Sequence, residues 1–534
     1  MKRLLASLFF VSMFLVAQAQ KAGDVVILFD NDVHCAVDGY PVLAGLRDSM
    51  EREGCHVAVV SAGDFSSGGL IGTLSHGDAV VRMMNAVGYD AACLGNHEFD
   101  MGVAHMLHLD SLLYAPMLSC NFVDMRTGTL PVHPFVVRQY GDVRIAFVGV
   151  TTPSTLTGSS PSYFQDSTGR WVYTFSSETL VAQVQRWVDA ALASGAHYVV
   201  LLSHLGDREE RQNSTWLVSQ LSGVDVVLDG HDHHVIPGQM MKDKLSGEVL
   251  LASTGSKFLK IGMLVIPADG SPMQCRLMDV DILQSIGCTD TAMASELDLI
   301  SAEYQADGQR VVAESEVDLV AIDAKEFRVS RMQEVNLGNL VADAFRTVLR
   351  ADVGWMNGGG LRENIAAGEV SHNMLLAAMP YSNRICRVRV TGQALLDALE
   401  IAVRQCPVPN GGFPQLSGLR LRIDTTVVSG VELDSRGTFV RIKGPRRVKD
   451  VKILQEGRWV PLNPKATYTV AGSEYVLTRG GDAVVFPGSR LMANPKGLPE
   501  GATEADVVER YLQENLRGRV TAKLYGSQTS RIRY

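Results

Sequence analysis

Short apolar segments alternate with amphipathic stretches over the first half of the chain, and this alternation limits the possible folds most strongly. The apolar runs are Val25–Phe29, Val57–Val60, Ala91–Leu94, Ile145–Val150, Tyr198–Leu202, Val224–Leu228 and Val249–Leu251. They are short and rich in β-branched residues, and most are apolar throughout, as strands buried on both faces should be. Stretches such as Ala79–Val87 and Leu180–Leu192 carry apolar residues at helical spacing. The pattern predicts a layered α/β domain.

The 534 residues are too many for one ordinary hydrophobic core, so we expect two large domains. Residues 286–324 are charged around sparse apolar positions, and we interpret them as a helical connector. The first domain is then expected over 22–285 and the second over 325–534. The second half mixes a predicted helix at Asn339–Leu349 with short predicted strands at Ile385–Val390 and Thr467–Ala471, and with glycine-rich loops.

The N-terminus has the anatomy of a secretory signal peptide. Lys2 and Arg3 precede an apolar run over Leu4–Val16, and Ala17 and Ala19 place small residues at −3 and −1 of a cleavage site. We expect residues 1–19 to be removed and the protein to be exported, to the periplasm or beyond; an uncleaved anchor is the alternative. The run is too short to span a bilayer comfortably, and no later segment reaches transmembrane length. Export permits disulfides, but the eight cysteines show no CxxC spacing, and the sequence leaves their pairing open.

Composition excludes several classes of protein. Hydrophobic residues make up 46% and charged residues 20% of the chain, which is typical of a soluble globular protein. The net charge is −9 and no long basic run occurs. We therefore expect no binding of a nucleic-acid duplex, because that requires a continuous positive surface. A small phosphorylated substrate needs only local positive charge.

Asp, Asn and His side chains follow five of the predicted strands. They are Asp32 and His34 after the first, Asp64 after the second, Asn96, His97 and Asp100 after the third, then His204, and then His231 and His233. Open α/β sheets build their sites at the carboxyl ends of strands, so these side chains are expected to converge. An Asp-x-His or a Gly-Asp alone means little, whereas Gly-Asn-His-Glu and the order of all five are specific.

These residue types suit a pair of divalent ions such as zinc, manganese or magnesium. Imidazole, carboxylate and amide oxygen are their usual ligands, and two ions need a bridging carboxylate to screen their repulsion. A water that bridges both ions is acidified and becomes a hydroxide nucleophile near neutral pH.

The motifs NDVH and GNHEFD, together with the other three clusters, resemble those of the bacterial 5′-nucleotidase family. The resemblance implies an α/β fold: an N-terminal four-layer α/β metallophosphoesterase domain with a second α+β substrate-binding domain. It implies that Asp32, His34 and His233 hold one metal, that Asn96, His204 and His231 hold the other, and that Asp64 bridges them. It further implies that His97 stabilises charge in the transition state and that Asp100 orients its ring.

Three neighbours of these motifs have ordinary structural interpretations. His234 extends the GHDHH string, but the family pattern uses only the two alternate histidines. Asp30 is expected to support the site or the fold, and Cys35 is expected to pack in the interior.

The second half extends the resemblance. Asn357 to Arg362 spell NGGGLR, a flexible loop that ends in a guanidinium and suits an anionic ligand. By resemblance, Arg331, Asn357, Arg362 and Asp482 bind substrate. Tyr381 matches one of two aromatic rings that clamp the base, but Val476 stands where the second ring should be. Tyr475 is adjacent and, in a strand, would point elsewhere.

The implied activity is hydrolysis of nucleoside 5′-monophosphates by a hydroxide that bridges two metals. The alternatives are a 2′,3′-cyclic nucleotide phosphodiesterase, a nucleotide-sugar hydrolase, and a relative that acts on carrier-bound sulfate groups in sulfur oxidation. A non-catalytic nucleotide-binding or adhesion protein is a more distant alternative, which the complete set of ligand residues disfavours. The expected partner is a small nucleotide, and the sequence leaves the oligomeric state open.

Overall fold

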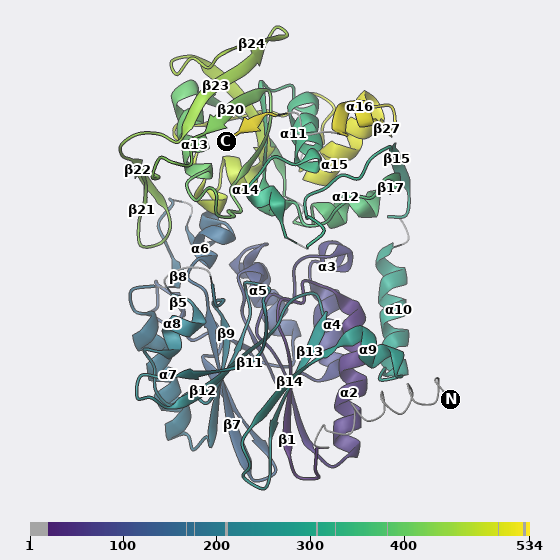
Figure 1. The fold of residues 1–534 in the computed structure, drawn as a ribbon, viewed down its shortest axis with the longest axis vertical. Coiled ribbons are helices and arrows are strands. Elements are labelled where there is room, and N and C mark those ends of the chain that lie inside the picture. Colours follow the sequence, from purple (N-terminus) through teal and green to yellow (C-terminus); the bar gives the residue numbers. More distant parts are fainter. Residues whose placement is uncertain are drawn as a thin grey trace, which may run out of the picture.

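The computed structural model describes residues 20–166, 168–175, 177–208, 212–305, 308–325, 327–381, 383–499, 501–526 and 530–534. The predicted signal peptide at 1–19 lies outside the described residues. The chain forms two bodies, with the first half below the second in Figure 1. Among the described residues, no helix combines the length and apolarity needed to cross a membrane.

Two six-stranded sheets form the centre of the first half. The first has the order β14-β13-β1-β2-β3-β4 and the second the order β11-β12-β10-β9-β7-β6. In the first sheet the strands are β1 (Val25–Asp30), β2 (His56–Ser61), β3 (Ala91–Cys93), β4 (Met117–Leu118), β13 (Lys260–Ile266) and β14 (Gln274–Asp279). In the second they are β6 (Phe135–Tyr140), β7 (Val143–Thr151), β9 (Tyr198–His204), β10 (Val226–Asp229), β11 (Val235–Lys242) and β12 (Glu248–Thr254).

The two sheets pack face to face and helices cover their outer faces. Val25, Ile27 and Val60 of the first sheet share one apolar cluster with Phe147 and Leu228 of the second. The covering helices are α2 (Tyr40–Arg52), α4 (Asp78–Val87) and α5 (Val103–Leu112) on the first sheet, and α7 (Leu180–Ala193) and α8 (Ser214–Val218) on the second. The predicted four-layer α/β arrangement is confirmed, and burial on both faces explains why central strands such as β1 and β10 are apolar along most of their length.

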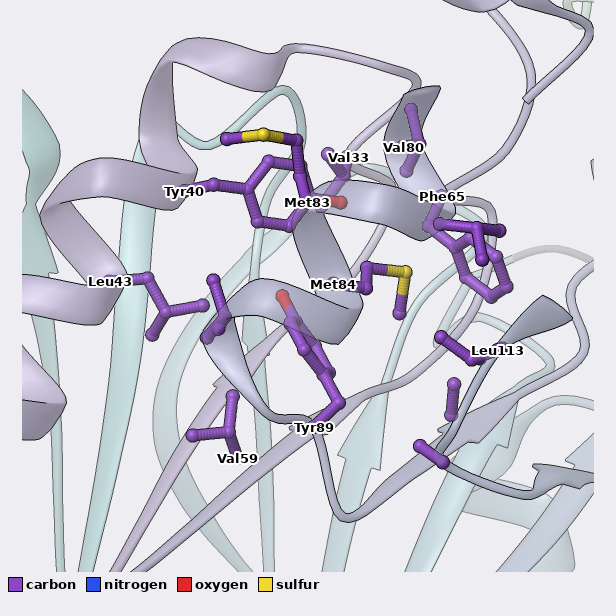
Figure 2. Close-up of a cluster of buried hydrophobic side chains, with 14 of the residues drawn as sticks. Val33, Tyr40, Leu43, Val59, Phe65, Val80, Met83, Met84, Tyr89 and Leu113 are labelled. Atoms are coloured by element: carbon purple, nitrogen blue, oxygen red, sulfur yellow. The ribbon is translucent and has the colours of Figure 1, made fainter. Parts of the chain in front are cut away.

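The core beneath the first sheet also anchors the loops that leave it. Figure 2 shows Val33 and Phe65 among Tyr40, Met83 and Met84, side chains of α2 and α4. Val33 and Phe65 are fully buried. Each stands next to the polar residues of a predicted metal-binding loop, so burial of the apolar neighbour holds the loop in place.

The second half is an α+β body, as predicted. A five-stranded sheet has the order β19-β16-β25-β18-β26, and a four-stranded sheet has the order β24-β23-β20-β28. The strands of the first are β16 (Val353–Asn357), β18 (Ile385–Thr391), β19 (Pro414–Ser417), β25 (Thr467–Ser473) and β26 (Arg490–Met492). Those of the second are β20 (Leu419–Ile423), β23 (Val448–Gln455), β24 (Arg458–Pro461) and β28 (Ile532–Arg533). The main helices are α11 (Asn336–Val348), α12 (His372–Ala378), α13 (Gly392–Ala402) and α15 (Glu504–Arg510).

The described part of the segment interpreted as a connector contains one helix and one strand. Helix α10 (Thr291–Gln305) buries Met293, Leu297 and Ile300 against the core of the first half. Strand β15 (Val311–Ser315) pairs with β17 (Gly368–Ser371) and β27 (Arg519–Val520) of the second half. The exact domain boundaries remain a prediction.

Candidate active site

The five polar loops of the first half meet at one edge, where they face the second half. Several of their residues have a left-handed backbone: φ is 50° at Asp32, 47° at His34, 57° at Asp64, 87° at His231 and 61° at His233. This conformation is uncommon for residues with a side chain and is concentrated at functional sites. The packing of the loops therefore holds the backbone at these residues in a conformation that is otherwise unfavourable, and this sets the direction of each side chain.

Asp32, His34 and His233 form the first group of donor atoms. Asp32 Oδ1 lies 3.4 Å from His233 Nε2 and 3.8 Å from His34 Nε2. The two ring nitrogens lie 3.0 Å apart. The other carboxylate oxygen of Asp32 accepts the main-chain N–H of His231 at 2.9 Å, which orients the carboxylate.

Asp64 stands between this group and the next one. Its Oδ2 lies 3.1 Å from His204 Nε2 and 3.9 Å from His34 Nε2. On the far side, Asn96 Oδ1 lies 2.9 Å from His231 Nδ1. The position of Asp64 is the one that a bridging carboxylate would take.

The donor set fits divalent metal ions. Asp32 Oδ1 is buried and has no hydrogen-bond partner among the described residues. In two of the histidines, the ring nitrogen Nδ1 contacts a main-chain carbonyl oxygen. His34 Nδ1 lies 3.0 Å from the Ser67 oxygen, and His204 Nδ1 lies 2.7 Å from the Ala62 oxygen. Such contacts aim the free nitrogen at a metal and fix the tautomer.

The electrostatics of two of these histidines favour ligation. Burial lowers the pKa of both His34 and His233 well below the ordinary histidine value. Both imidazoles are therefore neutral at neutral pH and present a lone pair. Ligand atoms of Asp32, His34 and His233, and also of Asp32, Asp64 and His204, lie within 4.8 Å of one another. The His231 ring lies 5.3 Å from the His204 ring and contacts Asn96, so all seven predicted metal ligands come together at one place.

His97 and Asp100 form a hydrogen-bonded dyad beside the donor set. His97 Nδ1 lies 2.8 Å from Asp100 Oδ2, and Ser67 Oγ donates to the same oxygen at 2.6 Å. Burial alone would lower the pKa of His97, but the negative charges of Asp100 and Asp64 raise it above the ordinary value. The ring is therefore suited to carry a proton and to present Nε2–H to an anionic oxygen.

A cavity between the two halves places the predicted substrate residues opposite this centre. Asn96, His97 and His231 line it from the first half, and Arg331, Asn357, Arg362, Tyr381 and Asp482 line it from the second. The Tyr381 ring stacks on the His97 ring, with centroids 5.5 Å apart and planes at 11°. The Arg362 guanidinium carbon lies 5.6 Å from the centroid of the Tyr381 ring.

Comparison with known proteins identifies both halves. Residues 25–235 match the family described as calcineurin-like phosphoesterase, and residues 311–488 match the family described as the C-terminal domain of 5′-nucleotidase. The chain belongs to the 5′-nucleotidase family. Like its relatives, it is a hydrolase of phosphoric ester bonds.

Similarity to individual family members runs along nearly the whole chain. The chain is 24% identical over 508 residues to a 5′-nucleotidase of Vibrio parahaemolyticus, covering 88% of this chain and 83% of that one. It is 24% identical over 506 residues to the UshA protein of Escherichia coli, covering 88% and 85%. A crystal structure of a 5′-nucleotidase precursor from Thermus thermophilus superposes with a TM-score of 0.77 at 25% identity, covering 96% and 99%.

Tyr475 lines the cavity of this 5′-nucleotidase family member. The expectation that its side chain points away from the site is wrong. Tyr475 lies in a helical turn, α14 (Glu474–Leu477), and not in a strand. Successive residues of a helix differ by about 100° in direction, not 180°. Val476 is 1% exposed and packs in the core, and its neighbour Tyr475 lines the cavity. A sequence analysis could have predicted the direction of the Tyr475 side chain only by recognising residues 474–477 as a helical turn.

Glu98 and Arg404 are two further residues that sequence reasoning missed. Glu98 is 1% exposed, and its carboxylate accepts main-chain N–H groups from the loops that carry Asp64 and Asn96. Arg404 lines the cavity beside Asp482, whose pKa is raised by burial and lowered in part by the charges of Arg331 and Arg404. The position of Glu98 inside the Gly-Asn-His-Glu motif is the one sequence feature that could have identified it. Arg404 lies in no recognised motif.

The three residues given structural interpretations have partners of their own. His234 Nδ1 lies 2.7 Å from Asp207 Oδ1. Asp30 accepts a hydrogen bond from the Tyr89 hydroxyl, and the buried Cys35 donates to the Phe65 carbonyl at 3.4 Å.

Proposed function

We propose that this protein is an exported dinuclear-metal phosphoesterase that hydrolyses nucleoside 5′-monophosphates to a nucleoside and phosphate. The observation that carries the proposal is the cavity between the halves. It has predicted metal-ligand side chains on one wall and three arginines with two aromatic rings on the other. A phosphate between these walls would meet the positive charge of the arginines and, when metals are bound, of the ions, while the nucleoside would lie along the second half.

The first wall would hold the metals. Asp32, His34 and His233 would bind one divalent ion, and Asn96, His204 and His231 the other, with Asp64 between them. When bound, such ions supply Lewis acidity and lower the pKa of water enough for attack near neutral pH. Zinc, manganese or magnesium would suit the donor set.

His97 would act on the leaving oxygen. With Nδ1 held by Asp100, its Nε2–H faces the cavity and can hydrogen-bond the ester oxygen as negative charge develops there. Asp100 keeps the ring in this orientation, and Ser67 in turn orients Asp100.

The second half would bind the substrate. Arg331 and Arg362 would hold phosphate oxygens, because a planar guanidinium forms paired hydrogen bonds with them. Tyr381 and Tyr475 would flank the base. Asp482, which accepts a hydrogen bond from Asn357 Nδ2 at 3.0 Å, would accept hydroxyl protons of the ribose.

Export and the domain division belong to the same proposal. The sequence of residues 1–19 supports secretion, and we propose domains at 22–285 and 325–534 joined through 286–324. The partner is a small nucleotide and not a nucleic-acid duplex.

Phosphate release by the mature protein tests the proposal. The protein would be incubated with Zn²⁺, Mn²⁺ or Mg²⁺ and with AMP, 2′,3′-cyclic AMP or UDP-glucose. With AMP, released phosphate would be measured directly. With the other two substrates, whose products are still phosphorylated, it would be measured after a phosphatase is added. We expect the largest kcat/KM with AMP. A larger kcat/KM with either other substrate would replace the proposed substrate, and an inactive protein in every metal would overturn the proposal.

A further inference from the structure

The hydroxyl group of Tyr475 is hydrogen-bonded to both halves of the protein. Its Oη donates to the carbonyl oxygen of Gly158 at 2.7 Å, and it accepts the main-chain N–H of Asp482 at 3.1 Å. Gly158 is the last residue of α6 (Thr155–Gly158) in the first half. Asp482 lies in η6 (Gly481–Ala483) in the second half. One side-chain atom therefore links two segments that are far apart in the sequence.

The surroundings of Tyr475 fit its ring closely. A Cβ at residue 481 would lie 2.3 Å from Cζ of Tyr475, so only glycine leaves room for the ring. Asp482 has a left-handed backbone, with φ of 54°, and its side chain is held by Asn357. Burial raises the pKa of Tyr475 well above the ordinary value. The hydroxyl thus keeps its proton and remains a donor over the whole physiological range.

Both segments that the hydroxyl joins line the substrate cavity. Thr157 and Gly158 contribute to it from α6, and Asp482 contributes from η6. A change in the seating of α6 would therefore alter the cavity at the same end as a change in the direction of Asp482. A phenylalanine at position 475 could supply the ring but neither hydrogen bond.

We propose that the Tyr475 hydroxyl is a positioning group for nucleotide binding, which couples the seating of α6 against the second half to the orientation of Asp482. The inference rests on the proposed function, because it assigns Asp482 to the nucleoside. It separates two contributions of Tyr475. The ring forms a wall of the cavity, and the hydroxyl ties that wall to both halves.

Tyr475→Phe isolates the hydroxyl, and Tyr468→Phe is the matched control. Tyr468 is buried in the same half, its hydroxyl accepts the Asn463 N–H at 3.1 Å, and it does not line the cavity. Loss of one or two ordinary hydrogen bonds should raise KM for AMP about 3–10-fold in Tyr475→Phe. The effect on kcat should stay within about twofold, because the bonds position the nucleoside and do not touch the reacting atoms.

Amide hydrogen exchange gives a readout that does not depend on turnover. In Tyr475→Phe, exchange should be faster in peptides that cover residues 478–486 and 154–160, because the Asp482 N–H loses its acceptor and α6 loses its link. Tyr468→Phe should match the wild type in both peptides and in KM. The increase in KM should also be greater for AMP than for p-nitrophenyl phosphate, which has no ribose.

Each result decides between the inference and its rivals. Wild-type KM and wild-type exchange in Tyr475→Phe would overturn the positioning role. An equal loss with AMP and p-nitrophenyl phosphate would place the effect at the metal centre and would also overturn it. A wild-type protein that releases no phosphate from AMP would refute the proposed function instead, while the exchange measurement would still test the link between the halves.

Discussion

The carboxylate of Glu98 accepts the main-chain N–H of Asp64 at 3.0 Å, although the two residues lie in loops that follow different strands. The same carboxylate accepts four more hydrogen bonds, from Gly95 N at 2.7 Å, Phe65 N at 3.0 Å, Ser66 N at 3.1 Å and Ser66 Oγ at 3.0 Å. Glu98 thus ties the loop of the candidate bridging ligand to the loop of His97.

Replacing Glu98 with glutamine should loosen the metal centre. The amide nitrogen of glutamine would face main-chain donors, and leaving such a buried group unsatisfied costs about 1–3 kcal/mol. We expect Glu98→Gln to weaken Mn²⁺ binding about 10–100-fold, the range for residues that orient metal ligands. Isothermal titration of the metal-free protein measures this. Glu369→Gln, at an exposed position, is the control; equal affinities in both variants would show that the Glu98 hydrogen bonds do not support the site.

His97→Ala should keep its metals and lose most of its turnover. His97 is not among the seven predicted ligands, and general acid catalysis of this kind contributes about 10²–10⁴-fold. Metal content by elemental analysis and kcat with AMP would be compared with the wild type. Asp100→Asn, which keeps the shape but not the charge beside the ring, should lose less. Wild-type kcat in His97→Ala would remove His97 from the mechanism.

Arg362→Ala should act mainly on KM. Its guanidinium lies over Tyr381 at the edge of the cavity and, in the proposed function, holds the phosphate before and during reaction. Removing an interaction that is equally strong in the substrate complex and in the transition state raises KM and leaves kcat nearly unchanged. A charged hydrogen bond of about 1.5–3 kcal/mol corresponds to roughly a 10–150-fold rise. Steady-state kinetics with AMP measure both constants, and a variant that saturates at wild-type concentrations would contradict the role.

Metal removal should lower thermal stability as well as activity. Asp32 Oδ1 is buried without a hydrogen-bond partner among the described residues, so bound ions should favour the folded state. A metal ion whose free concentration is 100 times its Kd stabilises the folded state by about 2.7 kcal/mol. Melting curves after chelation, and again after Zn²⁺ or Mn²⁺ is restored, test this. A melting temperature that is indifferent to chelation and to added ions would count against a metal site.

Glu504 should make the protein less stable at alkaline pH. It is fully buried beside Asn383, and burial raises its pKa from 4.5 to about 8. Between these values the folded state holds a proton that the unfolded state has lost, so the free energy of unfolding falls as pH rises from about 4.5 to about 8. Glu504→Gln should therefore raise the melting temperature at pH 9 by about 2–4 °C and change it little at pH 5. Glu248→Gln, on the surface, is the control, and equal gains at both pH values would contradict the assignment.

Much of the first half could be predicted because its signals are local. Val25–Phe29 and Tyr198–Leu202 are apolar on both faces, so they had to be central strands. Asp32 and Asp64 follow such strands, His204 is the last residue of β9, and a parallel sheet brings the carboxyl ends of its strands to one edge. The predicted helix at Asn339–Leu349 also corresponds closely to α11, because its apolar spacing is strong.

The sequence by itself determined the layers, the positions of the polar loops and the residue types at the site. Only the tertiary structure decided which way each side chain faces and what lies across the cavity. Val476 and Tyr475 show the reason: a short helical turn and the packing of Val476 into the core bring Tyr475 to the cavity, and neither is encoded in a local period. Glu98 shows the same for the metal loops, since its partners at 64–66 come close only when β2 and β3 pair. Contacts between distant segments depend on the whole folded chain, and no window of sequence contains them.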